Sequence, residues 1–247
     1  MTTFDINADL GEGGGADQAL LAIVSSASIA CGGHAGDDQT MRTALRLARA
    51  HGVAVGAHPG FADRENFGRR RLLLPPDELD EQVRGQVRRL VEIAEEEGVA
   101  VRFLKLHGAL ANMAAEEPVV SALCFAAVTG LVPDLAVLAI DCSAQVEVAQ
   151  AMGFRVVREA YADRAYLPDG LLVPRSEPGA VLHDPGLIVD RVLRLAQAGE
   201  IVAVDGSIVR SSARSICVHG DNHAAMEIAR AVRTALEANG IIVAAPY

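Results

Sequence analysis

The 247-residue chain contains no tryptophan, a single lysine and only four cysteines. The cysteines, Cys31, Cys124, Cys142 and Cys217, lie far apart without a CxxC pair, which excludes a dense disulfide scaffold and a cysteine-based zinc framework. We expect buried thiols. Lys105 is the exception among basic residues that are otherwise all arginine. With 22 basic and 32 acidic residues, the formal net charge is -10, which argues against a nucleic-acid partner.

The sequence also lacks long hydrophobic runs. No stretch approaches the roughly 20 consecutive apolar residues of a membrane-spanning helix. The first residues, Met1 to Asp5, do not follow the basic and then apolar order of a signal peptide. We therefore expect a cytoplasmic protein with no membrane partner. Hydrophobic residues make up 51% of the chain, and there is no linker or exact repeat, so we expect one domain over residues 1–247.

Short runs of Val, Ile and Leu alternate with longer segments of helical periodicity along the chain. This alternation is typical of parallel strands joined by crossover helices, so the predicted class is α/β with about seven units. The predicted strands are Phe4 to Ala8, Ala27 to Cys31, Val53 to Ala57, Val101 to Leu106, Leu135 to Ile140, Arg155 to Arg158 and Ser215 to Val218, with a short final strand at Ile241 to Ala244.

Three segments have acidic starts and glycine stops, which predicts helices from Asp38 to His51, Asp77 to Glu97 and Asp221 to Asn239. Two segments show neither strand nor helix periodicity, because both are rich in proline, glycine or arginine. They are Gly60 to Pro76 and Ala160 to Asp184. Long connections without regular structure in a compact domain are usually binding loops or lids. We expect both to lie over the functional site.

Polar residues gather where the predicted strands end. Because the carboxyl ends of parallel strands converge on one side of a barrel or sheet, we expect these side chains to meet there. They are Asp5, Asn7, Asp9, Glu12, His34, Asp37, His58, Lys105, His107, Asp141, Glu159, Asp163, His219 and Asp221.

Asp5, Asn7 and Asp9 alternate along the first strand and therefore share one face. Such a row beside histidines can bind a divalent metal, and it can equally form a hydrogen-bonded network without an ion. For a metal, Asp9, His34 and His58 are the first ligand candidates. No HExxH motif is present, nor a Walker loop or a GxSxG nucleophile elbow, so the sequence points to no standard zinc, ATP or serine-hydrolase site.

Two groups of arginines follow the strand ends. Arg69 or Arg70, after His58, could pair bidentately with an anionic substrate, or the run could be a solvated loop. On the second long loop, Asp163 and Arg164 could form a structural ion pair, or Arg164 and Arg175 could close over the ligand.

Eight motifs in this order resemble the LamB/YcsF family over nearly the whole chain. They are DINADLGE (5–12), ACGGHAGD (30–37), GAHPGF (56–61), FGRR (67–70), KLHGAL (105–110), EAYADRAY (159–166), VPR (173–175) and CVHGDN (217–222). The chain departs from the family at Leu106 and Ala111, where proline and tyrosine are common, and at Gly33, where a bulkier aromatic is common. These departures concern the shape of the pocket.

The resemblance implies a seven-stranded (β/α) barrel of the glycoside hydrolase/deacetylase type. It also implies participation in the ATP-dependent ring opening of 5-oxo-L-proline to L-glutamate, with ATP and Mg²⁺ as co-substrate of the assembled enzyme and with partner subunits B and C. A homo-oligomer is compatible with it. On this hypothesis Lys105 and one or more of His34, His58 and His107 stabilise the lactam oxygen or its phosphate, while Asp9 or another carboxylate directs water.

The remaining strand-end residues would bind the substrate. Arg69 or Arg70 would hold its carboxylate, and the other candidates for this binding role are Asn7, Glu12, Asp163, Arg164, Arg175, His219 and Asp221. Two alternatives stay open. One is a metal-dependent deacetylase or amidohydrolase that acts on a small amide or an acetylated sugar. The other is a noncatalytic subunit that presents 5-oxoproline or an acidic sugar to its partners.

Overall fold

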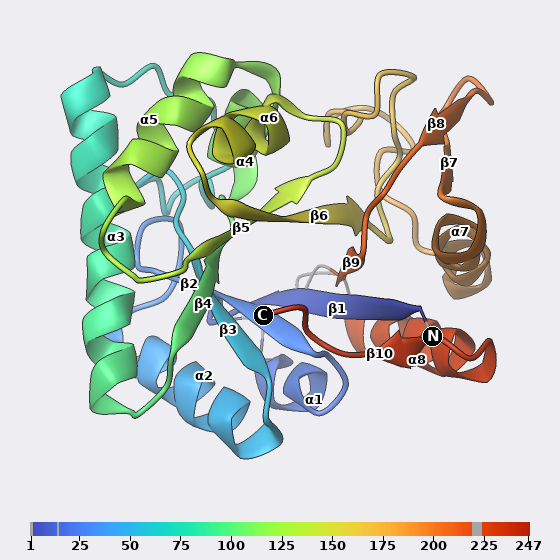
Figure 1. Ribbon diagram of the computed structural model, residues 1–247, viewed down its shortest axis with the longest axis horizontal. Helices are drawn as coiled ribbons and strands as arrows, with labels where there is room; N and C mark the ends of the chain where they lie inside the picture. Colours follow the sequence, from blue (N-terminus) through green and yellow to red (C-terminus); the bar gives the residue numbers. More distant parts are fainter. Residues whose placement is uncertain (1, 14, 219–223) are drawn as a thin grey trace.

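Seven parallel strands close into a barrel in the computed structural model, which describes residues 2–13, 15–218 and 224–247 (Figure 1). The barrel order is β1-β2-β3-β4-β5-β6-β9, and β9 pairs with β1 to complete the circle. The prediction of a seven-stranded (β/α) barrel is therefore confirmed. The barrel strands are β1 (Thr3–Leu10), β2 (Ser26–Ala30), β3 (Ala54–His58), β4 (Val101–Leu104), β5 (Ala136–Ile140), β6 (Arg155–Tyr161) and β9 (Ser215–Val218).

Helices surround the barrel and bury their apolar faces against its outside. The helix predicted from Asp38 to His51 is found with those bounds, and a capping box at Asp37 fixes its start. The long helix expected after the first loop runs from Pro76 to Glu96. The helices are α1 (Asp17–Leu21), α2 (Asp38–His51), α3 (Pro76–Glu96), α4 (Gly108–Glu116), α5 (Pro118–Val128), α6 (Ala144–Ala151), α7 (Pro185–Ala198) and α8 (Ala225–Ala238).

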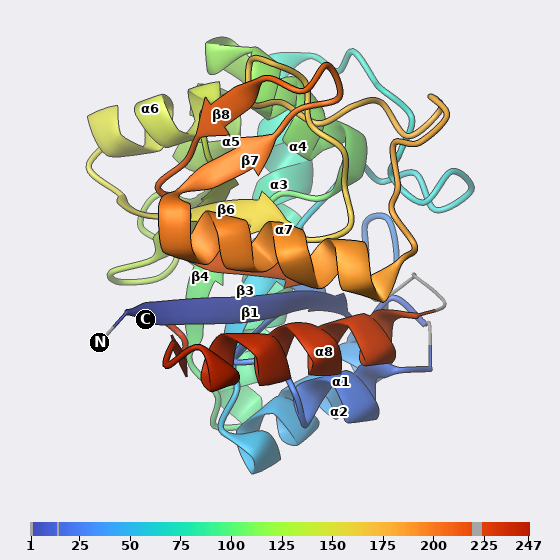
Figure 2. The ribbon, with the colours of Figure 1, turned by 90° about the vertical axis from the view of Figure 1, so that its right-hand side faces the viewer.

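Two differences from the prediction concern strands. A two-stranded antiparallel hairpin, β7 (Glu200–Val202) and β8 (Ile208–Arg210), stands outside the barrel beside α7 (Figure 2). The fourth strand ends at Leu104, so Lys105 directly follows it, although the Lys105 amide still donates to the carbonyl of Ala57 at 2.9 Å. The predicted start of the last helix at Asp221 lies outside the described residues.

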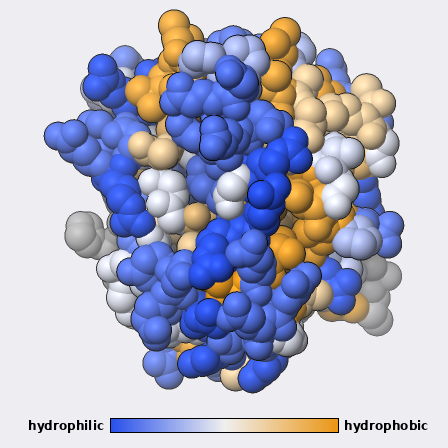
Figure 3. Space-filling model, turned by 90° about the vertical axis from the view of Figure 1, so that its left-hand side faces the viewer, coloured by the Kyte–Doolittle hydropathy of each residue, from blue (hydrophilic) through white to orange (hydrophobic). Residues whose placement is uncertain are grey.

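The final strand and the two long loops are found close to their predicted positions, with shifted ends. The short final strand, β10 (Ile242–Val243), pairs with β1 on the outer edge of the barrel. The segments expected to be loops, Gly60 to Pro76 and Ala160 to Asp184, lack helices and ladder strands over residues 60–75 and 162–184, while Pro76 begins α3 and Ala160 lies in β6. Within the described part of the chain, no helix is both long enough and apolar enough to cross a membrane. The face that α3 covers is mainly hydrophilic, with smaller hydrophobic areas (Figure 3).

The inside of the barrel is unusual because one side of it is polar. Along β1 the apolar residues belong to the core between the barrel and its helices, whereas Asp5 and Asn7 point into the barrel and are fully buried. Asp5 accepts hydrogen bonds from Ser25, Ser26 and Ser215. A separate apolar cluster, formed by Phe103, Ala136, Leu138 and Val157, fills the other side. The expected row of polar side chains on one face of the first strand is thus present.

Candidate functional site

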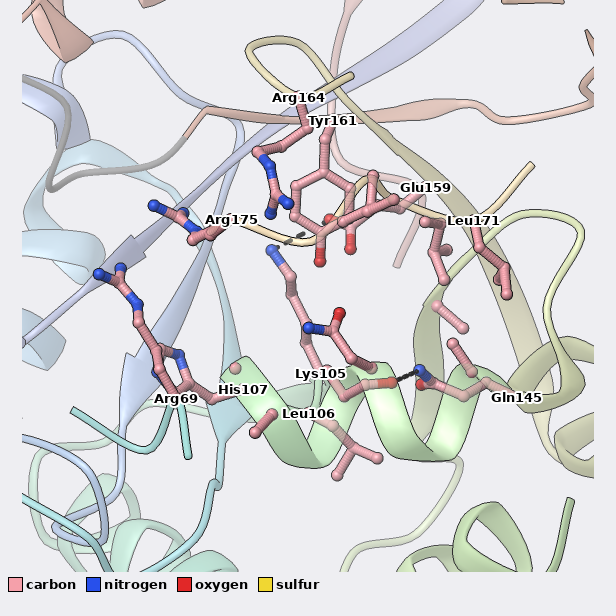
Figure 4. Close-up of a pocket in the computed structure, with 18 of the residues that line it drawn as sticks. Arg69, Lys105, Leu106, His107, Gln145, Glu159, Tyr161, Arg164, Leu171 and Arg175 are labelled. Carbon is pink, nitrogen blue, oxygen red and sulfur yellow. Dashed lines mark hydrogen bonds and ion pairs between the residues drawn. The ribbon is translucent and has the colours of Figure 1, made fainter. Parts of the chain in front are cut away.

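A cavity of about 340 Å³ opens at the carboxyl ends of the barrel strands (Figure 4). Side chains from β1, β3, β5 and β6 line it, together with the segment after β4, helix α4 and the loop after β6. The polar residues of its wall are Asp9, Glu12, His58, Arg69, Arg71, Lys105, His107, Asn112, Glu116, Gln145, Glu159, Tyr161, Arg164, Arg175 and Ser176. This is the position at which barrel proteins of this kind place their ligands.

Lys105 is the charged centre of the cavity floor and is only 2% exposed. Its Nζ donates to Asp9 Oδ1 at 2.9 Å and to Asn7 Oδ1 at 3.1 Å, and it lies 3.1 Å from Glu159 Oε2. The side-chain amide of Asn7 also donates to Glu159, and it thereby links β1 to β6 behind the lysine. Burying one ammonium group between two carboxylates is tolerable only because each partner is satisfied by hydrogen bonds.

The charges around Lys105 set its ionisation. Burial by itself would lower the pKa of Lys105, but Asp9, Cys217 and Glu159 raise this pKa well above its ordinary value. The lysine is therefore an ammonium group at neutral pH. Cys217 Sγ lies 3.0 Å from Nζ, yet burial raises the pKa of this thiol well above 9.0. Burial likewise raises the pKa of Tyr161, whose ring centre is 5.2 Å from Nζ.

Three histidines and one glutamate form a second group, which we call the histidine cluster: Glu12, His34, His58 and His107. One ligand atom from each lies within 4.8 Å of all the others, so the cluster is able to hold a metal ion. His58 Nδ1 is 2.8 Å from the carbonyl of Lys105, and His107 Nε2 is 2.9 Å from the carbonyl of Phe67. A carbonyl oxygen can only accept, so both of these ring nitrogens carry protons.

The protonation of the cluster follows from burial and from its neighbours. Burial lowers the pKa of His34 far below its ordinary value, and burial together with the charge of His58 lowers the pKa of His107 to about 3. Burial also opposes the charging of His58, but Asp9 outweighs it and raises the pKa of His58 above 6.5. Of the three rings, His58 is therefore the one whose charged form its neighbours favour, and its Nε2 lies 3.0 Å from His107 Nδ1.

Close backbone packing positions the cluster. A side chain at Gly68 would place its Cβ 2.7 Å from His34 Cβ, and Gly68 has a φ of +63° that favours glycine. From α3, the Gln86 side chain donates to the Gly60 carbonyl at 2.7 Å and accepts from the Gly60 amide at 3.2 Å. Gly33 leaves room for this amide, because a Cβ at Gly33 would meet Gln86 at 2.3 Å. The departure at Gly33 noted in the sequence thus accommodates a contact that holds the loop after β3.

Arginines face the cavity from two loops. Arg164 is buried, donates to the carbonyls of Ala180 and Val173, and points with Lys105 and Tyr161 into the same space (Figure 4). Arg175 lies nearby on the same loop, and Arg69 reaches in from the loop after β3. The protein carries a net charge of -10, but this part of the cavity is rich in positive charge and suits an anionic ligand.

Most of the predicted site residues meet at this cavity. Asp9, Glu12, His58, Lys105, His107, Arg69, Arg164 and Arg175 line it. Asn7 and His34 lie directly behind the wall, in contact with Lys105 and Glu12 respectively. Asp163 is buried outside the lining, and Arg70 is exposed and does not line the cavity. His219 and Asp221 lie outside the described residues.

Three strand-end residues have structural roles instead. Asp37 caps α2, Asp5 joins β1 to its neighbouring strands, and Asp141 accepts from Arg158 and from the Ser212 amide. From the sequence, Glu159 is expected at a strand end but is given no role in the site. Tyr161 is not among the expected site residues. The strand ending EAY contains the signal for both, since alternate residues of that strand face the barrel interior.

Comparisons with known proteins agree with this geometry. The model of the LamB/YcsF family matches residues 4–247. A protein of Azorhizobium caulinodans, named as the A subunit of 5-oxoprolinase, is 45% identical over 99% of this chain and 98% of its own length. The crystal structure of the lactam utilization protein from Thermus thermophilus superposes with a TM-score of 0.91 at 41% identity, covering 99% of this chain and 100% of that one. The peptidoglycan deacetylase PdaC from Bacillus subtilis shares the fold, with a TM-score of 0.53 at 13% identity over 98% of this chain and 87% of that one.

Proposed function

The chain belongs to the LamB/YcsF family, and we propose that it acts as the A subunit of a 5-oxoprolinase. In this role it takes part, with subunits B and C, in the ATP-dependent hydrolytic opening of 5-oxo-L-proline to L-glutamate. The observation that carries the proposal is the cavity itself, which joins a buried ammonium–carboxylate centre to an arginine-rich wall. The relatives' name supplies the reaction that this chemistry suits.

5-Oxo-L-proline has two polar ends that match the two parts of the cavity. Its carboxylate would pair with Arg69, Arg164 or Arg175, because guanidinium groups bind carboxylates through two parallel hydrogen bonds. The lactam would then lie toward Lys105 and the histidine cluster. Of the two arginines considered from the sequence, Arg69 is the better candidate because Arg70 does not line the cavity.

The unstrained lactam is stabilised by resonance and resists hydrolysis. Phosphorylation of its oxygen by ATP with Mg²⁺, as co-substrate of the assembled enzyme, would activate the carbonyl carbon toward water. Lys105, with His58 and His107, would stabilise negative charge on that oxygen or its phosphate. Asp9, which lines the cavity 3.5 Å from His58 Nε2, would direct the water. The phosphates of ATP would be held by strand-end amides of this chain or by a partner subunit.

The test is glutamate release from 5-oxo-L-proline with ATP and Mg²⁺. The chain is assayed alone and then with candidate subunits B and C from the same genome. We expect activity only in the mixture. Arg69→Gln should raise KM with little change in kcat, because it removes binding common to ground and transition states. Lys105→Ala should abolish turnover, and Arg102→Gln, an exposed change on β4, is the matched control. Full activity of Lys105→Ala would remove the assigned role of the lysine.

The histidine cluster favours one second candidate, a metal-dependent deacetylase or amidohydrolase acting on a small amide or an acetylated sugar. This function would need no ATP and no partner subunit. Acetate release from N-acetylated sugars by the metal-loaded chain, with no glutamate formed in any well-folded mixture, would favour it. Binding of 5-oxoproline without turnover in any mixture would instead favour a noncatalytic presenting subunit.

A further inference from the structure

We propose that Glu12, His34, His58 and His107 bind one divalent transition-metal ion of the zinc type, with Glu12 as the carboxylate ligand. The inference goes beyond the proposed function, because ring opening with ATP and Mg²⁺ requires no such ion. It also differs from the ligand set Asp9, His34 and His58 that the sequence suggested.

The orientation of two histidine rings is the first argument. The backbone carbonyls of Lys105 and Phe67 hold the protons of His58 Nδ1 and His107 Nε2. Metal-bound histidines typically donate their second ring nitrogen in this way, which fixes the tautomer and aims the other nitrogen. The two remaining nitrogens, His58 Nε2 and His107 Nδ1, face each other at 3.0 Å. Two lone pairs at that distance repel unless a proton or a metal ion lies between them.

The other two residues decide between a proton and a metal. A shared proton needs only His58 and His107, yet Glu12 Oε1 lies 3.0 Å from His34 Nε2, 3.5 Å from His107 Nδ1 and 4.0 Å from His58 Nε2. Ligand atoms around a tetrahedral zinc ion with bonds of about 2.0–2.1 Å are about 3.4 Å apart. The three distances to Glu12 scatter around this value, and ligand atoms of all four residues lie within 4.8 Å of one another. The rings of His34 and His107 stack with their centres 3.5 Å apart, so one of them would turn for both to point at one ion.

His34 presents its Nε2 atom to the cluster, 3.0 Å from Glu12 Oε1. Its side chain is fully buried, and its Nδ1 atom has no hydrogen-bond partner among the described residues. Nδ1 is not the atom that faces Glu12, so its lack of a partner is separate from binding at Nε2. Nitrogen and carboxylate donors in this ratio suit zinc or cobalt better than magnesium, which prefers oxygen ligands.

Glu12 is a better ligand candidate than Asp9 because of where each carboxylate lies. Asp9 Oδ1 accepts from Lys105 at 2.9 Å, and its other oxygen lies 3.5 Å from His58 Nε2. Glu12 contacts all three histidines. Four protein ligands would fill a tetrahedral ion, as in sites that organise structure, so the ion would fix the loops that bear the cluster.

The experiment uses the full chain without a histidine tag, stripped with a chelator and titrated with Co²⁺, whose visible absorption reports tetrahedral nitrogen and oxygen ligands. Zinc content is measured in parallel by mass spectrometry. We expect one ion per chain and displacement of Co²⁺ by Zn²⁺. Glu12→Gln and His107→Ala should each weaken binding at least about tenfold. His51→Ala, at the exposed end of α2, is the histidine control and should bind normally.

Asp9→Asn distinguishes the two ligand sets, and circular dichroism verifies that each variant is folded. Retained binding in Asp9→Asn with loss in Glu12→Gln supports the proposal. The reverse result overturns it in favour of the set with Asp9. Absence of stoichiometric binding by the unmodified chain overturns it in favour of a shared proton, and leaves the proposed function unaffected because the readout is metal binding alone.

Discussion

Lys105→Met should be among the most destabilising single substitutions in this chain. Methionine keeps the length of the side chain but removes the ammonium group that lies 2.9 Å from Asp9 and 3.1 Å from Glu159. Removing one member of a buried ion pair costs about 3–5 kcal/mol, because the other charge is left without compensation. Here two carboxylates lose their partner, but Asp9 lines an open cavity, so water relieves part of its loss. We expect about 3–5 kcal/mol, a large part of the roughly 5–15 kcal/mol of a typical domain.

The assay is urea unfolding followed by circular dichroism at neutral pH, since a chain without tryptophan offers no indole fluorescence. Lys105→Met with Glu159→Gln should be more stable than Lys105→Met alone, because the second change neutralises the more deeply buried of the two carboxylates. Arg84→Met is the surface control. It also removes a cation from a carboxylate, Asp80, but both groups are solvated and little change is expected. A loss below about 1 kcal/mol for Lys105→Met, with an unchanged denaturant slope, would refute the reasoning.

Three further predictions concern residues around the site. Burial would raise the pKa of Asp141, but hydrogen bonds from Arg158 and the Ser212 amide outweigh it and hold this pKa below its ordinary 3.8. Asp141→Asn should therefore lower stability at pH 7, and the difference from the unmodified chain should begin to shrink only as pH falls through 3.8. A constant difference down to about pH 2 in acid-unfolding curves would contradict this. Gly68→Ala should lower the unfolding free energy more than Gly52→Ala, since both residues have positive φ but only Gly68 would press on a neighbour; equal urea midpoints would argue against this packing. Gln86→Ala removes two hydrogen bonds to Gly60 and should cost about 1–2 kcal/mol in the same assay. A neutral result would show that these hydrogen bonds do not stabilise the loop after β3.

The barrel can be predicted from the sequence because each strand is a short apolar run that ends at polar residues. All seven barrel strands lie close to their predicted positions, since burial on both faces leaves a strong signal in parallel strands. The hairpin of β7 and β8 escapes prediction because each of its strands has three residues, too few to show a period of two.

The site is only partly predictable, for a physical reason. Position at a strand end brings Lys105, His58 and His107 together correctly, but Asp141 occupies the same kind of position and serves structure. The sequence does not reveal which neighbour satisfies a given carboxylate. The choice between Asp9 and Glu12 as partner of the histidines likewise depends on contacts across the barrel that only the fold defines.

The closure of the barrel by β9 has a consequence for how the chain is made. Ser215 donates to Asp5, which lies 210 residues earlier, and β9 fills the space between β6 and β1. During synthesis the first six barrel strands leave the ribosome long before β9. Until β9 is made, the facing edges of β1 and β6 have no partner strand. Contacts of such sequence separation form slowly, because a long loop must close first. The acidic and amide side chains of β1 make this unpaired edge polar. This disfavours its pairing with a second nascent chain before β9 is in place.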